Sequence, residues 1–326
     1  MHAWTAQART IFNAAWLYYI HGAKQDEVAD RLSISRASVA LYLRKAREMG
    51  LVQIRMEDDF FRSLFQARAI EEACGLAAVS VVPGLSAEPL RDVAAAAWLT
   101  LEPHLAGARR LGVAWGRTVY EIAGVLPRVN HPGLEVAQLC GNLGGTPYGT
   151  LPDTSTFRIA RQLGAEPRNL YAPMILSSAG VAAALRAEPV IRDHIAKLAG
   201  CDIALFSLGT CRADSHIVTS GALSAAEIER YHEEGARAVL AGHLIRGDGS
   251  PVREIDERLI SLPLDALKEI PVRIVVANGA EKAEAVVAAL KGGYATHLIV
   301  DEAIAEAVLA DPDIASASEN ALPQPA

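Results

Sequence analysis

Four short stretches of the chain combine glycine with small polar residues, and each follows an apolar run rich in β-forming residues. They are "AWGRT" (114–118), "CGNLGGTPYG" (140–149), "SLGT" (207–210) and "ANGAEK" (277–282). Glycine lets backbone N–H groups approach an anion or a hydroxyl closely, and the N-terminus of a following helix adds a favourable potential. These residue types therefore predict binding of a small polar molecule. The alternative is that each glycine only permits a tight turn between a strand and a helix.

Lys282 opens a predicted helix, where a cation is unfavourable beside the positive end of the helix dipole unless something negative lies nearby. This position predicts contact with a ligand phosphate, carboxylate or carbonyl. The alternative is a surface lysine paired with Glu281 or Glu284. Arg117 leaves the same two alternatives open, and the polar run 153–156 offers hydrogen bonds to ligand hydroxyls.

Other cofactor and metal chemistry finds little support in the sequence. "GNLGG" is not a G-x-G-x-x-G fingerprint with an acidic residue at the required distance, so no dinucleotide is predicted. The four cysteines form no CxxC pair and lie near no histidine cluster, which argues against a zinc site or a disulfide framework. We expect no cofactor, no metal and four reduced thiols.

Charge is divided unevenly along the chain. Up to Met56 the sequence has eight basic and four acidic residues, a net charge of +4, which leaves −11 for the remainder because the whole chain carries −7. A basic head on an acidic body predicts that only the head meets a polyanion.

The basic head has the pattern of a helix-turn-helix. A first helix ends at Gly22, a second contains Val28, Ala29 and Leu32, and "SIS" interrupts the helical pattern, with Ser35 as the N-cap of a third helix. Gly50 ends the third helix, and the alternating "LVQIRM" that follows predicts a short strand, as in a winged domain.

A helix-turn-helix places its second helix in the DNA major groove, where the N-terminal side chains of that helix face base edges. The alternative is a helical hairpin whose arginines are only a solvated face. The predicted base-facing residues are Ser35, Arg36, Ala37, Ser38 and Leu41, and the predicted phosphate-binding residues are Gln25, Arg44, Lys45 and Arg47.

Beyond the head, continuous apolar runs alternate with Ala-rich helices, which predicts a Rossmann-like, doubly wound α/β domain with a parallel sheet. The predicted strands are "AAVSVV", "RRLGVA", "LEVAQLC", "NLYAP", "DIALFSLG", "VRIVVA" and "THLIV". The organisation we predict is a DNA-binding domain (1–57), a connecting or dimerising helix (58–75), an effector-binding and oligomerisation domain (76–312) and a flexible tail (313–326).

No apolar run approaches the roughly 18 residues that a membrane-spanning helix needs. The N-terminal "MHAWTAQART" has no apolar core typical of a signal peptide. We expect a cytoplasmic protein without a membrane partner.

These motifs together resemble the SorC-type family of sugar-binding bacterial transcriptional regulators, also called SorC/DeoR. The distinctive matches are "AAWLYYIHGAKQDEVADRLSISRASVALYLRKAREMGLVQI" and "VRIVVANGAEKAEAVVAALKGGYATHLIVDEAIAEAVL", with support from "LGVAWGRTVYEIA" and "LCGNLGG". The resemblance covers about residues 9–309.

The resemblance implies a domain similar to sugar-phosphate isomerases and deaminases that acts as a sensor and not as a catalyst. It also implies a homo-oligomer, a dimer or tetramer, that binds operator DNA and responds to a sugar, polyol or sugar phosphate. Together the loops and the resemblance give a predicted effector-binding set: Gly116, Arg117, Thr118, Gly141, Asn142, Gly144, Gly145, Thr154, Gly209, Arg246, Asn278, Gly279 and Lys282.

The chain departs from the family pattern in "ARAVLAGHLIRGDGSPV", where Val239 and Arg246 occupy positions that are usually acidic. Carboxylates at these positions would bind sugar hydroxyls, so their loss leaves the identity of the ligand open.

The sequence therefore predicts an effector-controlled transcriptional regulator of a carbohydrate or polyol catabolic operon. The rival hypothesis is a sugar-phosphate isomerase or deaminase with a DNA-binding head, in which Lys282 is an acid or a Schiff-base former. Against the rival, the predicted loops contain no carboxylate and histidine constellation.

Overall fold

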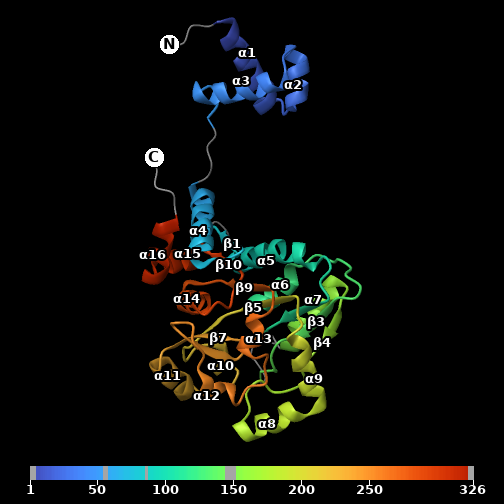
Figure 1. Ribbon diagram of the computed structural model, residues 1–326, viewed down its shortest axis with the longest axis vertical. Helices are drawn as coiled ribbons and strands as arrows, with labels where there is room; N and C mark the ends of the chain where they lie inside the picture. Colours follow the sequence, from blue (N-terminus) through green and yellow to red (C-terminus); the bar gives the residue numbers. More distant parts are fainter. Residues whose placement is uncertain (1–4, 54–57, 85–86, 144–151, 322–326) are drawn as a thin grey trace. The chain divides into compact units, whose positions relative to one another are not determined.

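The computed structural model describes residues 5–53, 58–84, 87–143 and 152–321 (Figure 1). The chain divides into two compact units, Met1–Glu57 and Asp58–Ala326. This division agrees with the charge boundary, because the basic residues of the head lie in the first unit.

The first unit is a three-helix head around a small apolar core. Helix α1 (Ala6–Ala15) continues as a π-helix (Trp16–Ile20), and it is followed by α2 (Gln25–Leu32) and α3 (Arg36–Glu48). The core consists of fully buried side chains from all three helices: Ile11, Ala14, Val28, Val39, Leu43 and Ala46. The three helices and the turn between α2 and α3 are consistent with the predicted helix-turn-helix.

The turn between α2 and α3 depends on two serines. Ser33 takes a left-handed conformation with φ of 55°, and Ser35 caps α3 because its Oγ accepts a hydrogen bond from the Ser38 N–H (3.1 Å). The predicted strand after Gly50 is wrong for residues 51–53, which pack back toward α3 through hydrogen bonds from the N–H groups of residues 51 and 52 to the Ala46 carbonyl. The rest of that segment lies outside the described residues.

Replacing Ser35 with Ala is expected to destabilise the head by about 1 kcal/mol, because one backbone N–H at the start of α3 loses its acceptor. Urea unfolding followed by far-ultraviolet circular dichroism measures the change. Ser38→Ala is the control, since it removes a neighbouring hydroxyl and keeps the capped N–H. Equal stability of both variants would contradict the role of Ser35 as a cap.

The second unit is built on a seven-stranded parallel sheet with the strand order β1-β10-β9-β5-β2-β3-β4 (Figure 1). The strands are β1 (Ala78–Val82), β2 (Arg110–Val113), β3 (Glu135–Gln138), β4 (Glu166–Arg168), β5 (Ile203–Ser207), β9 (Val272–Ala277) and β10 (His297–Asp301). This is the predicted doubly wound α/β fold.

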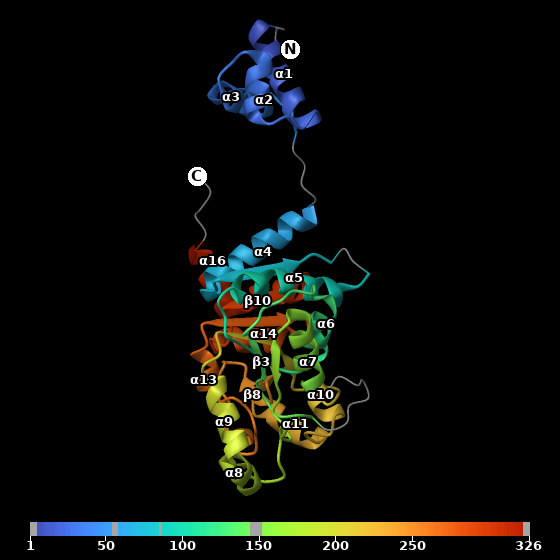
Figure 2. The same ribbon diagram turned by 90° about the vertical axis from the view of Figure 1, so that its right-hand side faces the viewer.

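Helices cover both faces of the sheet, and alternate residues of each strand point to opposite faces. In β5, Ile203 and Leu205 join the core beneath α5 (Pro89–Leu105), α6 (Arg117–Val125) and α7 (Pro152–Leu163). Ala204 and Phe206 join the opposite core with α4 (Asp58–Cys74), α14 (Ala283–Lys291) and α15 (Glu302–Ala310). Figure 2 shows α4 and α16 at one end of this unit and α8 at the other.

The predicted strand "NLYAP" is wrong. The edge strand is β4, three residues earlier, and it is paired with β3 and reinforced by an ion pair of Arg168 with Glu135 (2.9 Å). The chain then leaves the sheet, because the N–H of Leu170 donates to the side chain of Gln138 (3.0 Å) and not to a neighbouring strand.

A second, antiparallel sheet was not predicted. It contains β6 (Gly209–Thr210), β7 (Ala236–Leu240) and β8 (His243–Arg246) in that order. Ala241 and Gly242 join β7 to β8 with φ of 49° and 93°, as a two-residue hairpin turn requires.

The remaining helices connect these strands. They are α8 (Ala179–Ala187), α9 (Pro189–Leu198), α10 (His216–Thr219), α11 (Ala225–Glu233), α12 (Arg253–Asp256), α13 (Leu264–Lys268), the 3-10 turn Ala280–Lys282 and α16 (Pro312–Ala321). Within the described residues, no helix is both long enough and apolar enough to cross a membrane.

The segment predicted as a flexible tail contains α16 as far as residue 321, and α16 packs against α4. Ile314 is buried, and Lys291 Nζ binds the carboxylates of Asp311 (3.0 Å) and Asp313 (2.5 Å). The sequence did not predict this helix because the segment consists mainly of small and polar residues. Burial of Ile314 and the two ion pairs of Lys291 stabilise the helix.

Candidate effector pocket and DNA-binding face

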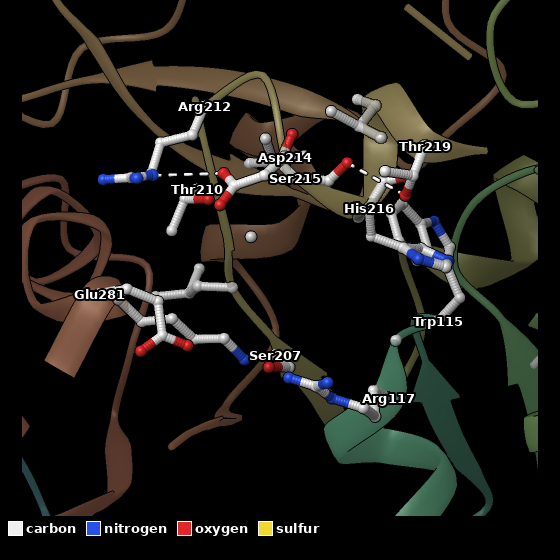
Figure 3. Close-up of a pocket in the computed structure, with 17 residues that line it drawn as sticks. Trp115, Arg117, Ser207, Thr210, Arg212, Asp214, Ser215, His216, Thr219 and Glu281 are labelled. Carbon is white, nitrogen blue, oxygen red and sulfur yellow. Dashed lines mark hydrogen bonds and ion pairs between the residues drawn. The ribbon is translucent and has the colours of Figure 1, made fainter. Parts of the chain in front are cut away.

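A pocket of about 380 Å³ lies beyond the carboxyl ends of β2, β5 and β9, where ligands bind in open α/β sheets (Figure 3). Part of its wall comes from the hairpin β7-β8 and from the segment that contains α10. The lining residues are Trp115, Gly116, Arg117, Ser207, Leu208, Gly209, Thr210, Arg212, Asp214, Ser215, His216, Ile217, Thr219, Val239, Ala241, Glu281 and Lys282.

Lys282 is partly buried in this pocket, and its Nζ donates to Thr118 Oγ1 (3.3 Å). Burial and the nearby guanidinium of Arg117 lower the pKa of Lys282 to about 8. Among the described residues, Lys282 makes no ion pair within 4 Å with Glu281 or Glu284. The arrangement leaves a cation available to a ligand and removes the surface ion pair that was the alternative.

The N-terminus of α6 opens on the same side of the pocket. Gly116 is the N-cap residue, with φ of 137°, and supplies no capping side chain, while the first turn has no acidic residue. The free N–H groups of this nine-residue helix and its dipole therefore add positive potential beside Arg117 and Lys282. An anionic group of a ligand is the chemical partner that this set favours.

Two buried hydroxyls of the pocket lining lack hydrogen-bond partners among the described residues. Ser207 and Ser215 are 8% and 7% exposed, and the Oγ atom of each has no hydrogen bond among the described residues. Buried polar groups nearly always have a partner, so these two hydroxyls indicate where a ligand or ordered water binds. In Figure 3, Ser207 lies near Arg117 and Ser215 lies near Asp214, on opposite sides of the view.

The sequence did not single out the aromatic wall of the pocket. The rings of Trp115 and His216 lie 5.3 Å apart, and Trp115 Nε1 is 3.1 Å from the sulfur of Met174. Burial and Arg117 lower the pKa of His216, which favours the neutral ring. Trp115 lies inside the quoted stretch "AWGRT", so an aromatic residue next to a ligand-loop glycine was the available signal.

The structure brings together Gly116, Arg117, Gly209 and Lys282 from the predicted effector-binding set, and Thr118 contacts Lys282 from just behind the wall. Val239, at a usually acidic position of the family, lines the pocket with an apolar side chain. Gly144 and Gly145 lie outside the described residues, and the side chain of Thr154 is not among those described.

The other predicted members lie outside the pocket lining and have structural contacts. Asn278 Nδ2 and the N–H of Gly279 donate to Asp301 Oδ2 (2.8 and 2.6 Å), which fixes the loop after β9. Arg246 binds the carbonyls of Glu234 and Pro251 (3.3 and 2.8 Å).

Gly141 and Asn142 join β3 to the segment 170–174. A Cβ at Gly141 would lie 2.7 to 2.8 Å from backbone atoms of residues 172–174, so only glycine fits there. Asn142 exchanges backbone hydrogen bonds with Ala172 and Met174 (2.7 and 2.8 Å). These two residues fix the segment 172–174 and are not part of the pocket lining.

Anion binding is expected to weaken as the pH rises above about 8. The charged form of Lys282 is fully present well below its pKa of about 8 and is lost above it, and a bound anion raises that pKa. Affinity should then fall by up to about tenfold per pH unit. The stability of the unliganded protein should change in the opposite direction. Because the pKa of Lys282 is lower in the folded than in the unfolded protein, the free energy of unfolding should rise between pH 8 and the ordinary pKa of 10.5.

Titration of a phosphorylated sugar into the protein between pH 7 and 10 measures this dependence. Lys282→Arg is the matched control, since a guanidinium remains charged throughout that range. A wild-type curve as flat as that of the Arg variant would show that Lys282 does not meet the anion.

In the head, the predicted DNA-binding residues lie in α3, at its N-cap Ser35 and, for Gln25, at the start of α2. The exposed residues are Arg36, Ala37, Leu41, Arg44 and Arg47, whereas Gln25, Ser38 and Lys45 are partly buried and Ser35 is used as the cap. Arg36 and Arg44 form exposed ion pairs with Asp26 (3.4 Å) and Glu48 (3.7 Å), which are weak and can be released to phosphates.

Comparisons with known proteins extend over both units. The family model Sugar-bind, described as "Putative sugar-binding domain", matches residues 58–310. The Uncharacterized transcriptional regulator YjhU of Escherichia coli (strain K12) is 33% identical over 309 residues, which are 92% of this chain and 94% of that protein. The Transcriptional regulator LsrR of the same strain is 31% identical over 306 residues, 90% of this chain and 92% of that protein.

Solved structures show the same fold. The full-length sorbitol operon regulator SorC from Klebsiella pneumoniae has a TM-score of 0.69 and 22% identity, covering 94% of this chain and 100% of that chain. A DeoR family transcriptional regulator from Listeria monocytogenes has a TM-score of 0.69 and 25% identity, covering 76% of this chain and 99% of that chain.

The fold and the similar proteins define a sugar-responsive transcription regulator with an α/β sugar-binding domain. The chain belongs to the SorC-type family of sugar-binding transcriptional regulators. The resemblance inferred from the sequence is thereby confirmed.

Proposed function

We propose that this regulator binds operator DNA through α3 and is controlled by an anionic sugar derivative, a sugar phosphate or a sugar acid, in the pocket beyond β2, β5 and β9. The observation that carries the proposal is the meeting of Lys282 and Arg117 at the uncapped N-terminus of α6, beside the unpartnered hydroxyl of Ser207. These groups match the charge and the acceptor oxygens of a phosphate or carboxylate.

Part of the pocket lining is apolar, which favours a ligand with few hydroxyls. The apolar lining residues include Leu208, Ile217 and Val239, and the lining also contains the aromatic residue Trp115. The exposed Asp214 is paired with Arg212 (3.2 Å), so it is only partly available to a sugar hydroxyl. An acidic or phosphorylated compound with a compact, partly deoxygenated body fits this cationic and apolar lining better than a neutral polyol does.

A thermal-shift screen with matched compounds tests the proposal. Glucose, ribose and sorbitol are compared with glucose 6-phosphate, ribose 5-phosphate, sorbitol 6-phosphate and gluconate. A compound that binds only the folded protein adds about 2.7 kcal/mol at 100 times its dissociation constant. We expect shifts only with anionic compounds. A shift with a neutral polyol alone would overturn the anionic assignment.

A sensor role, and not catalysis, is the second part of the proposal. Trp115, Arg117 and Lys282 line the same pocket, where they would bind and orient a ligand; the isomerase or deaminase hypothesis would require Lys282 to act on a carbonyl of that ligand. The sensor is supported by the relatives, which are named transcriptional regulators. Unchanged substrate after overnight incubation with each compound that binds supports the sensor; product formation supports the enzyme.

We also propose a homo-oligomer, a dimer or tetramer, that acts on DNA in the cytoplasm. A chain with one helix-turn-helix head needs a second copy to bind a two-fold operator. Helix α4 supports association, because Phe61, Leu64 and Phe65 are 45%, 53% and 58% exposed on it. Light scattering during size-exclusion chromatography gives the mass; a monomer at micromolar concentration, with and without operator DNA, would contradict the oligomer.

A further inference from the structure

The outward side of α3 carries an apolar patch that the head itself does not use. Ala37, Ala40 and Leu41 are exposed, Leu41 by 37%, whereas the core residues Val39 and Leu43 lie on the opposite side of the helix. Residues three and four positions apart share a face, so the three side chains form one surface in the first half of the helix. We call Ala37, Ala40 and Leu41 the apolar patch.

Basic side chains surround the apolar patch. Arg36 precedes it, and Arg44 and Arg47 follow on the next turns, all exposed. The head as a whole has a net charge of +4. A small apolar surface surrounded by cations is complementary to a polyanion that displays small apolar groups at regular spacing.

Few polar side chains are available to read bases in this half of the helix. The hydroxyls of Ser35 and Ser38 lie 2.9 Å apart, and Ser35 also accepts the Ser38 N–H. Positions 36–41 contain no Asn, Gln, Asp or Glu. Positions 36–41 therefore lack the side chains that usually bind the edges of adenine and cytosine. Arg36 is the residue among them that could bind guanine.

We propose that the apolar patch reads the C5 methyl groups of thymine in the major groove, so that each operator half-site is selected mainly by thymines at fixed positions. The C5 methyl is the apolar group that a base pair displays in that groove, and alanine-type side chains contact it directly. Arg44 and Arg47 would bind the flanking phosphates and hold the patch against the bases. The inference rests on the DNA-binding function proposed above.

The test uses the full chain and a duplex enriched from a random-sequence pool by binding to it. Each thymine of one half-site is replaced in turn by deoxyuridine, which removes only the methyl group. One buried methyl contributes about 0.8 kcal/mol, so we expect about fourfold weaker binding at two or three positions. In Leu41→Ala the penalty should disappear at one of these positions and remain at the others.

Arg44→Ala is the comparison variant. Loss of a phosphate contact should weaken thymine and deoxyuridine duplexes equally and reduce the dependence on salt, leaving the methyl penalty intact. Circular dichroism establishes that both variants fold, as expected for two exposed positions. If every deoxyuridine duplex bound as tightly as the thymine duplex while binding stayed sequence-selective, the reading of thymine methyl groups would be wrong, but DNA binding would still hold. If binding instead required a guanine, and Arg36→Ala removed that requirement, recognition of guanine by Arg36 would replace the proposal. Failure to enrich any sequence would refute the DNA-binding function itself.

Discussion

Replacing Lys282 with Met is expected to weaken binding of an anionic effector by about 10- to 100-fold. A hydrogen bond to a charged partner contributes about 1.5 to 3 kcal/mol, and Lys282 is a partly buried cation of the pocket whose Nζ donates a hydrogen bond only to the neutral Thr118 hydroxyl among the described residues. Methionine keeps most of the length and the apolar stem of lysine, so that the change isolates the charge. Isothermal titration with the anionic compound found in the screen measures the loss.

Stability separates this effect from unfolding. Burial opposes the charge on Lys282, so the Met variant should be at least as stable as the wild type when no ligand is present. Lys197→Met serves as the control, because Lys197 is an exposed lysine of α9 outside the pocket lining. If both variants bound the compound with wild-type affinity, the anion would have to lie elsewhere in the protein.

Replacing Leu43 with Ala is expected to remove operator binding while leaving effector binding intact. Leu43 is 5% exposed in the core of the head, and truncation of a buried leucine costs about 2 to 5 kcal/mol. Small domains have little stability to lose, at roughly 0.05 to 0.15 kcal/mol per residue. The head should therefore be largely unfolded at 37 °C, whereas the pocket lies in the other unit.

Leu41→Ala is the matched control, with the same substitution two positions away at a side chain that is 37% exposed. Fluorescence anisotropy with labelled operator DNA should detect binding by Leu41→Ala, weakened only a few fold, and none by Leu43→Ala. Both variants should show the wild-type thermal shift with the effector. Loss of that shift in Leu43→Ala would mean that the two units do not fold independently.

Local sequence patterns predicted the head and most of the parallel sheet. The turn residues at Ser33 and Ser35 and the buried positions of α3 act through contacts close in the sequence, and strands such as β5 are apolar on both faces. Propensity and periodicity therefore contain the relevant information. The prediction misplaced the edge strand β4 because the neighbouring "NLYAP" is as apolar as a strand. In the structure, the N–H of Leu170 in that segment donates a hydrogen bond to the side chain of Gln138 and not to a neighbouring strand.

Long-range contacts explain what the sequence did not reveal. Helix α16 depends on Lys291, some twenty residues earlier, and the hairpin β7-β8 needs Ala241 in a left-handed conformation that alanine rarely takes. In the pocket, Lys282 and Arg117 could be predicted because the glycine, the charged residue and the start of the helix are neighbours in the sequence. Ser215, His216 and Ile217 come from another segment, and only the fold brings them to the same cavity.

The central claim is that the pocket controls the head, and the most direct measurement is the affinity for operator DNA with and without a saturating anionic effector. Such coupling typically amounts to 1 to 3 kcal/mol, or about 5- to 150-fold. We predict a change within this range for the wild-type protein and none for Lys282→Met at the same effector concentration. Equal operator affinity of the wild-type protein with and without a compound that demonstrably binds the pocket would contradict the account.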